Sequence, residues 1–247
     1  MHQASRAIVA PVPDCCSTDP PGVPAPYVGA ADCECPVDPR IGRYFDRRSL
    51  NRRTVGDRYE LGRVSRALLA ALLAAGPAER TVLELGCGPG ALLADLLIAG
   101  AGPATGIDLS AAAIEEARQR AAEAGVAERV SFSVADGARA PVTAHDWVIL
   151  DKVMCCYPEV DALLANSIPA ARRLYAFAVP ASYGWRGILA RIEEALENAT
   201  NALRGRPCPG YVHDVAEIER RLEAAGFRPS YRGNSWTWHI AVFERGA

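Results

Sequence analysis

The chain has 247 residues, 50% of them hydrophobic, and carries a formal net charge of −2. This length and apolar content suffice for one substantial domain with a well-filled core. The near-neutral charge gives no electrostatic basis for binding nucleic acid, which would require a clear basic excess. Because no stretch approaches the roughly eighteen uninterrupted apolar residues of a membrane span, we expect a cytoplasmic soluble protein without a membrane span.

Residues 1–39 differ in composition from the rest of the chain. The first forty residues hold eight of the eighteen prolines and few large apolar side chains, so little burial can offset the entropy of ordering them. We predict a Pro/Cys-rich flexible arm over residues 1–39 and a single domain over residues 40–247. The arm contains Cys15, Cys16, Cys33 and Cys35, which could give four thiolates to zinc or a soft metalloid. Their CC and CxC spacings are not those of a standard zinc site, so we assign no metal and leave this alternative open.

Residues 40–76 have a helical pattern. Nine arginines and three acids between Arg40 and Arg66 are interleaved with apolar residues, which is typical of an amphipathic helix. The apolar run that follows ends at Gly76-Pro77. We therefore predict an N-terminal helical cover over residues 40–76.

Short apolar runs alternate with helical segments beyond this cover. Strands are predicted over residues 81–86, 104–110, 129–136, 145–153 and 172–180, with helices between them that include one opened by Ser110 as N-cap. Such alternation requires parallel crossovers, so it predicts an α/β fold with a Rossmann-like doubly wound sheet.

The C-terminal part interrupts and then completes this alternation. A helical insertion is predicted over residues 184–206, and a further helix begins after Asp214 as N-cap. Two strands around a turn at Gly233-Asn234 follow. The sheet should therefore be mostly parallel, with a C-terminal antiparallel strand pair.

The stretch VLELGCGPG, Val82 to Gly90, carries the strongest functional signal. It follows a strand and opens a helix, so its glycines should lie at the carboxyl edge of the sheet, where open α/β folds bind ligands. Gly86 and Gly88 would let the backbone approach a ligand, and Gly90 would let the next helix pack tightly. Asp108 ends the second strand, where a carboxylate can accept both hydroxyls of a ribose.

These motifs resemble those of the class I S-adenosylmethionine-dependent methyltransferases. The glycine spacing is GxGxG and not the dinucleotide form GxGxxG, and Glu84 precedes it. The resemblance implies the class I methyltransferase fold, S-adenosyl-L-methionine as cofactor, and Asp151 facing the methyl donor. It implies that Glu84 and the glycine loop hold the methionine end, Asp108 with its neighbour the ribose, and Asp136 with its neighbour the adenine. The cofactor-binding residues carried over are Glu84, Gly86, Cys87, Gly88, Gly90, Asp108, Leu109, Asp136, Gly137 and Asp151.

Methyl transfer from a sulfonium depends mainly on aligning the reacting atoms and excluding water. A general base is required only if the acceptor must first lose a proton. The candidates are Asp151 and His213, with His239 as a further possibility.

The stretch LDKVMCCYP and the segments after it resemble a bacterial group loosely similar to the magnesium-protoporphyrin O-methyltransferases. This implies methylation of a small-molecule acceptor on oxygen, with oligomeric state left open. The predicted substrate contacts are Lys152, Cys155, Cys156 and Tyr157. Neighbouring side chains on a strand point to opposite faces, so we expect the two thiols to diverge and to form pocket wall and not a chelate.

Two alternatives remain open at the level of sequence. The cysteines could serve a thiol or metalloid (arsenite-like) methyltransferase. The chain could also be a non-catalytic cofactor-binding or metal-sensing protein.

Overall fold

A computed structural model describes residues 39–55, 60–157, 160–207 and 209–246. Residues 1–38 of the predicted arm, with its four cysteines, lie outside the described residues. Within the described ranges, no helix is long and apolar enough to cross a membrane.

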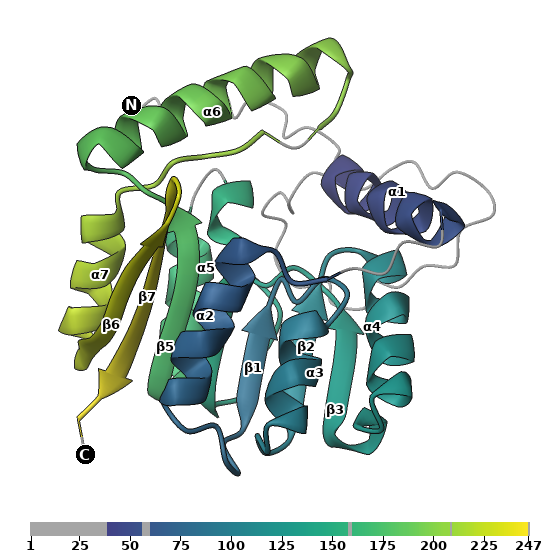
Figure 1. Cartoon of the computed structure of the whole chain (residues 1–247), viewed down its shortest axis with the longest axis vertical. Helices are drawn as coiled ribbons and strands as arrows, with labels where there is room; N and C mark the ends of the chain where they lie inside the picture. Colours follow the sequence, from purple (N-terminus) through teal and green to yellow (C-terminus); the bar gives the residue numbers. More distant parts are fainter. Residues whose placement is uncertain (1–38, 56–59, 158–159, 208, 247) are drawn as a thin grey trace, which may run out of the picture. The chain divides into compact units, whose positions relative to one another are not determined.

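Seven strands form one sheet in the order β3-β2-β1-β4-β5-β7-β6 (Figure 1). The strands are β1 Val82–Leu85, β2 Ala104–Asp108, β3 Val130–Val134, β4 His145–Asp151, β5 Ala171–Pro180, β6 Phe227–Ser235 and β7 Trp238–Arg245. Strands β1 to β5 pair in parallel, and β7 runs antiparallel between β5 and β6. The predicted doubly wound sheet with a C-terminal antiparallel pair is confirmed. The strand order reverses between β1 and β4, which makes the carboxyl ends of these strands the expected ligand site.

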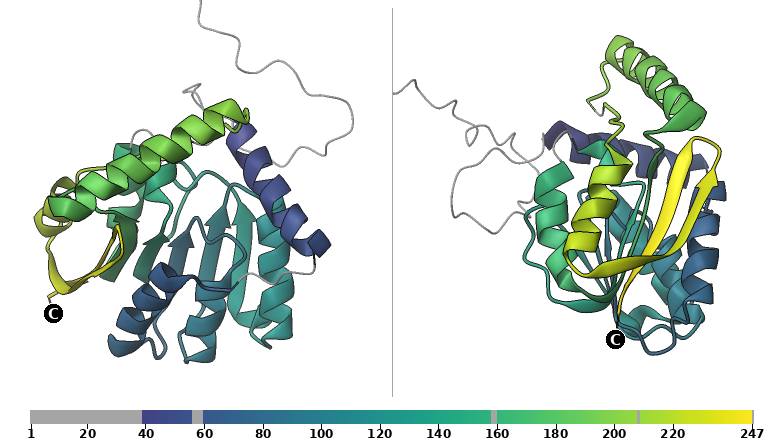
Figure 2. Two further views of the ribbon diagram at one scale, coloured as in Figure 1. Left: turned by 45° about the horizontal axis from the view of Figure 1, so that its top comes forward. Right: turned by 90° about the vertical axis from the view of Figure 1, so that its left-hand side faces the viewer.

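The helices cover both faces of the sheet (Figures 1 and 2). They are α1 Pro39–Val55, α2 Arg63–Ala74, α3 Ala91–Ile98, α4 Ala111–Glu123, α5 Val160–Ala170, α6 Gly184–Leu203 and α7 Val215–Ala224, with short 3-10 turns η1 Ala127–Arg129 and η2 Met154–Cys156. One apolar cluster joins α5 and α7 to the sheet, and a second joins α2, α3 and α4 to its other face. In β4, Val148 contributes to the first cluster and Ile149 to the second, because adjacent strand residues face opposite sides.

Both predicted N-caps are confirmed. The Ser110 hydroxyl accepts a hydrogen bond from Ala113 N at 3.0 Å, and the Asp214 carboxylate accepts one from Ala216 N at 3.0 Å. Each cap satisfies a backbone donor that has no partner within its own helix.

The predicted turn at Gly233-Asn234 is wrong. Both residues lie within β6, and the hairpin turns three residues later, at Trp236-Thr237 between Ser235 and Trp238. The intervening Trp236 and Thr237 donate side-chain hydrogen bonds to the Glu193 carboxylate of α6, at 2.8 and 2.7 Å. The shifted turn is therefore accompanied by a tertiary contact with α6, which local turn preferences cannot predict.

Helix α1 is fastened to α4 by one carboxylate. Asp46 Oδ1 accepts hydrogen bonds from Ser110 Oγ at 2.7 Å and from Ala112 N at 3.0 Å. A negative charge is favourable at this end of α4. Gly42 lies against the next loop, since a Cβ atom added there would be 3.2 Å from Leu109 O. These contacts hold α1 over the carboxyl ends of the strands.

We expect Asp46→Ala to loosen α1. Loss of such a cap costs about 1 kcal/mol, so trypsin should cleave at the arginines of α1 faster than in the wild type. Asp46→Asn keeps an acceptor oxygen and should retain most of the protection. Limited proteolysis with mass spectrometry measures the cleavage rates. Equal rates for the wild type and Asp46→Ala would show that this carboxylate does not hold the helix.

Candidate active site

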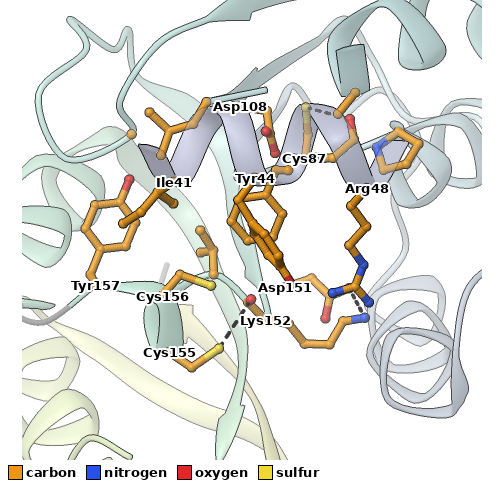
Figure 3. A pocket seen from close by; sticks show the side chains of 18 of the residues that line it. Ile41, Tyr44, Arg48, Cys87, Asp108, Asp151, Lys152, Cys155, Cys156 and Tyr157 are labelled. Carbon is orange, nitrogen blue, oxygen red and sulfur yellow. Dashed lines mark hydrogen bonds and ion pairs between the residues drawn. The ribbon is translucent and has the colours of Figure 1, made fainter. Parts of the chain in front are cut away.

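A pocket of about 370 Å³ opens where β1, β2 and β4 end. Residues of α1 and α6 also line it, and ten of its side chains are labelled in Figure 3. Twelve of the residues predicted from the sequence line it, namely Glu84, Gly86, Cys87, Gly88, Asp108, Leu109, Gly137, Asp151, Lys152, Cys155, Cys156 and Tyr157. Gly90, Asp136 and His213 are not among its lining residues.

Glu84 is a buried carboxylate at the floor of the pocket. Its residue is 2% exposed, and its Oε2 accepts no hydrogen bond from any described residue. Burial, followed by the nearby charges of Asp151 and Asp108, raises the pKa of Glu84 well above its usual value. A buried carboxylate without a partner is costly. This position is therefore suited to a ligand that brings a positive charge.

The three glycines of the loop have different structural roles. A Cβ atom at Gly86 would lie 2.4 Å from Val153 Cγ2, and one at Gly90 would lie 2.9 Å from the Ala117 Cβ atom. These two positions thus permit close packing within the protein. A Cβ atom at Gly88 would meet no atom of the described residues within 4 Å, so this glycine leaves open space beside the pocket.

The amide groups of the loop are already hydrogen-bonded. Gly86 N and Cys87 N both donate to Ile107 O, at 2.7 and 3.1 Å. Gly88 N donates to the Asp108 carboxylate at 2.8 Å. The end of β2 therefore fixes the loop before any ligand binds.

Asp108 lies between the glycine loop and α4. One oxygen accepts from Gly88 N and the other from Ser110 N, each at 2.8 Å. Burial raises the pKa of Asp108, against the lowering effect of these backbone donors. Each carboxylate oxygen has a second lone pair, so both can still accept a hydrogen bond from a ligand.

Phe132 of β3 fills the space that two glycines leave beneath the loop. Cβ atoms built at Gly106 and Gly90 would lie 2.7 and 3.3 Å from its ring. The Gly106 Cβ atom would also lie 2.8 Å from Cys87 Sγ. The Cys87 thiol is thus packed against β2 below the loop.

Asp151 ends β4 and faces the pocket together with Lys152. Lys152 Nζ lies 4.0 Å from Asp151 Oδ2, whereas Asp151 Oδ1 accepts no hydrogen bond from the described residues. Burial raises the pKa of Asp151. The carboxyl is therefore better suited to accept a proton near neutral pH than an exposed aspartate.

We expected the side chains of the two adjacent cysteines to point in opposite directions, and they do not. They belong to the 3-10 turn η2 and not to a strand, and the side chains of both line the pocket (Figure 3). The strand alternation on which the expectation rested ends at Asp151. Cys87 and Cys155 carry free thiols. No group of three or more potential metal ligands occurs among the residues that the structure describes.

Tyr157 is held in the pocket wall by Asp136. Its hydroxyl donates to Asp136 Oδ1 at 2.7 Å, and burial raises the pKa of Tyr157. The phenol therefore stays neutral. Asp136 itself lies behind the wall, while its neighbours Ala135 and Gly137 line the pocket.

The two candidate histidines lie elsewhere. His213 Nε2 is 3.1 Å from Met154 O and 2.9 Å from Tyr157 O, a geometry that ties the η2 segment to the start of α7. His239 is buried away from the pocket lining, with Nε2 3.0 Å from a Glu219 carboxylate oxygen. Burial lowers the pKa of His239.

Sequence reasoning missed the acidic face of α6. Glu194, Glu197 and Asn201 line the pocket, although the segment was predicted only as an insertion. Their spacing of three and four residues places them on one side of a helix, which is the signal that could have identified them. Burial, followed by the charges of Glu197 and Glu193, raises the pKa of Glu194.

Comparisons with known proteins agree on the class. Residues 82–172 match a family model described as a methyltransferase domain, whereas no curated protein matches the chain. The magnesium protoporphyrin IX methyltransferase from Synechocystis PCC 6803, solved with bound SAH, is 22% identical with a TM-score of 0.65, covering 85% of this chain and 100% of that one. An O-methyltransferase family protein from Burkholderia thailandensis is 18% identical with a TM-score of 0.61, covering 75% of this chain and 57% of that one.

A further solved structure, the mitomycin 7-O-methyltransferase, is 19% identical with a TM-score of 0.58, covering 75% of this chain and 55% of that one. These similarities concern the fold, and the domain match spans the glycine loop and the strands that carry the pocket carboxylates. Taken with the strand order, they show that residues 82–172 form a methyltransferase domain and that the chain has the class I methyltransferase fold.

Proposed function

We propose that this methyltransferase transfers the methyl group of S-adenosylmethionine to an oxygen atom of a small-molecule acceptor. The observation that carries the proposal is Glu84, a buried carboxylate that faces the pocket with an oxygen that accepts no hydrogen bond from the described residues. The pocket lining contains five carboxylates, of Glu84, Asp108, Asp151, Glu194 and Glu197, and two basic side chains, of Arg48 and Lys152. This excess of negative charge suits a cofactor that carries an ammonium and a sulfonium group.

The residues of the pocket fit such a cofactor in chain order. Glu84 would pair with the ammonium group, and the open side of Gly88 would admit the methionine backbone. Both oxygens of Asp108 retain a lone pair for the ribose hydroxyls. Leu109 and Gly137 would flank the adenine, with Asp136 acting through its hydrogen bonds to Tyr157 and to the Ala138 amide.

The bound cofactor supplies an electrophilic methyl group, and the chain has to orient the acceptor, exclude water and remove a proton where one is present. Asp151 is suited to remove that proton because it faces the pocket, has an oxygen that accepts no hydrogen bond from the described residues, and has a raised pKa. His213 would not take part in proton transfer. It would position the η2 segment through the carbonyl groups of Met154 and Tyr157. Lys152, Cys155, Cys156 and Tyr157 would form the acceptor wall.

Oxygen as the acceptor atom is supported by Asp151 and by the fold relatives that are O-methyltransferases. The direct experiment measures formation of S-adenosylhomocysteine from S-adenosylmethionine with a panel of small hydroxyl, carboxyl and thiol compounds and arsenite. Mass spectrometry of the product identifies the methylated atom. Turnover with hydroxyl or carboxyl acceptors is expected, and turnover with thiols or arsenite alone would contradict the proposal.

A second candidate is methylation of a thiol or metalloid. The observation in its favour is that both Cys155 and Cys156 line the pocket. The double variant Cys155→Ser/Cys156→Ser separates the two candidates. Oxygen methylation should survive it, whereas arsenite methylation that uses the thiols should be lost.

We expect Asp151→Asn to lower kcat about 10²-fold or more, which is the usual contribution of a general base. The amide has nearly the same shape but cannot accept the proton, so the Kd for S-adenosylhomocysteine should change little. The rise of kcat with pH through the raised pKa of Asp151 should disappear in the variant. Asp161→Asn, on the exposed surface of α5, is the matched control. An unchanged kcat would exclude Asp151 as the base.

A further inference from the structure

Helix α6 has its apolar side turned away from the protein. Trp185, Ile188, Ile192, Leu196 and Leu203 are between 50% and 90% exposed. Successive spacings of three, four, four and seven residues place them in one stripe along the helix. The 20 residues of α6 extend this apolar stripe over about 30 Å.

The opposite side of α6 contacts the protein. Gly187, Ala190 and Asn201 are buried, and Glu194 and Glu197 line the pocket. Asn198 binds Gly210 in both directions, with its amide donating to Gly210 O at 2.8 Å and its oxygen accepting from Gly210 N at 2.7 Å. A helix of an ordinary soluble domain buries its apolar stripe, so α6 has the reverse orientation.

Arginines outnumber glutamates along α6 and the turn that follows it. Arg186, Arg191, Arg204 and Arg206 lie along α6 and the turn that follows it, and the last three are exposed. Of the three glutamates of α6, Glu194 and Glu197 face the pocket, and Glu193 accepts hydrogen bonds from the β6–β7 turn. Glu193 and Glu197 are themselves exposed, so the apolar stripe is bordered by the arginines and, beside Trp236, by the Glu193 carboxylate.

Exposed aromatic residues gather at the N-terminal end of the stripe. Tyr183 and Trp185 are each 54% exposed, and Trp236 of the adjacent hairpin turn is 60% exposed. Arg186 joins them, since its Nε donates to Trp236 O at 3.1 Å and its guanidinium lies 4.3 Å from the Trp185 ring centroid. Tryptophan and tyrosine beside arginine are the residues that favour the interface between a bilayer and water.

We propose that the outer face of α6, defined by Trp185, Ile188, Ile192, Leu196 and Leu203, docks on the surface of an anionic lipid bilayer. Charge complementarity selects this occupant. A helix that lies in the membrane interface combines an apolar face that contains tryptophan with basic residues along its rim, and it binds anionic lipids more strongly. The charged residues on its other sides keep α6 at the surface, in agreement with the lack of a membrane-crossing helix among the described residues.

The test uses the full chain and sedimentation with vesicles of phosphatidylcholine, with and without phosphatidylglycerol. The wild type should bind vesicles that contain phosphatidylglycerol, bind pure phosphatidylcholine weakly, and dissociate as salt increases. Ile188→Asp/Leu196→Asp should reduce the bound fraction at limiting lipid by about tenfold. Absence of binding by the wild type, or equal binding by this variant, overturns the proposal.

Two controls separate lipid binding from other effects. Ile98→Asp changes an apolar residue of α3 that is 64% exposed and lies outside the stripe, so vesicle binding should not change. Arg204→Glu/Arg206→Glu should weaken binding to anionic vesicles only. Loss of the thermal shift with S-adenosylhomocysteine would show that the apolar variant misfolds. In that case the arginine variant decides whether the outer face of α6 binds anionic lipid. Sedimentation velocity without lipid tests the other occupant. A dimer that depends on Ile188 and Leu196, without vesicle binding, assigns the face to a second copy and overturns the proposal.

Discussion

Replacing Glu84 by glutamine is expected to weaken cofactor binding about thirtyfold while it stabilises the ligand-free protein. Loss of a hydrogen bond to the charged ammonium group costs about 2 kcal/mol, which corresponds to that factor. Without ligand, the same change removes a buried carboxylate with an oxygen that accepts no hydrogen bond from the described residues. A gain of about 1 kcal/mol is typical of single stabilising substitutions, and it would raise the Tm by about 3 °C. Titration calorimetry and thermal unfolding measure the two effects.

The pKa of Glu84 gives both effects a pH dependence. Because burial raises this pKa, the carboxyl takes up a proton as the pH falls through the raised value, and affinity for the cationic cofactor should fall with it. The sign for ligand-free stability is opposite. The folded state binds more protons than the unfolded state between the two pKa values, so the stability contributed by this group is lost as the pH rises through that window.

Glu84→Gln should flatten both pH profiles. Glu128→Gln, at an exposed position of η1, should leave them as in the wild type. An unaltered cofactor Kd in Glu84→Gln would contradict the assigned role of this residue.

Gly86→Ala is expected to destabilise the fold by about 3 kcal/mol. The new Cβ atom would lie 2.4 Å from Val153 Cγ2 and 2.8 Å from Val153 Cβ, and the residue has a φ of 71°. Overpacking costs about 1–3 kcal/mol and a left-handed conformation about 1–2 kcal/mol more. Urea unfolding in the absence of ligand measures the difference in free energy.

The matched control is Gly88→Ala in the same loop. Its φ is 51°, but within the described part of the chain no atom lies within 4 Å of the added Cβ atom. It should therefore lose only about 1 kcal/mol of stability, and its main effect should be on cofactor affinity because the methyl group enters the open side of the pocket. Equal destabilisation by the two variants would contradict the different roles assigned to these glycines.

The parallel part of the fold was predictable because each strand has its own local signal. Apolar runs identify β1 to β5, and Ser110 and Asp214 mark helix starts through hydrogen bonds to residues two or three positions away. The pocket carboxylates Glu84, Asp108 and Asp151 follow from this register, since parallel strands bring their carboxyl ends to one edge.

Features that depend on distant contacts were not predictable. The hairpin turn involves Trp236 and Thr237, which bind Glu193 of another element, so local turn preference selected the wrong pair of residues. The turn η2, which contains Cys155 and Cys156, closely follows β4. The alternation of side chains along a strand was therefore wrongly extended to these two cysteines. The orientation of α6 was also hidden, because periodicity identifies an apolar stripe without stating whether the protein or the solvent faces it.

The packing of Phe132 restricts how this site can change during evolution. Its ring occupies the space of the side chains missing at Gly90 and Gly106, and Ala117 and Cys87 close the same space from other sides. A larger residue at Gly106 would need more room at both Phe132 and Cys87, and one at Gly90 would need more room at both Ala117 and Phe132. Mutations at these positions should therefore be inherited in compensating combinations, while the acceptor wall, built from separate loops and helices, can diverge one residue at a time.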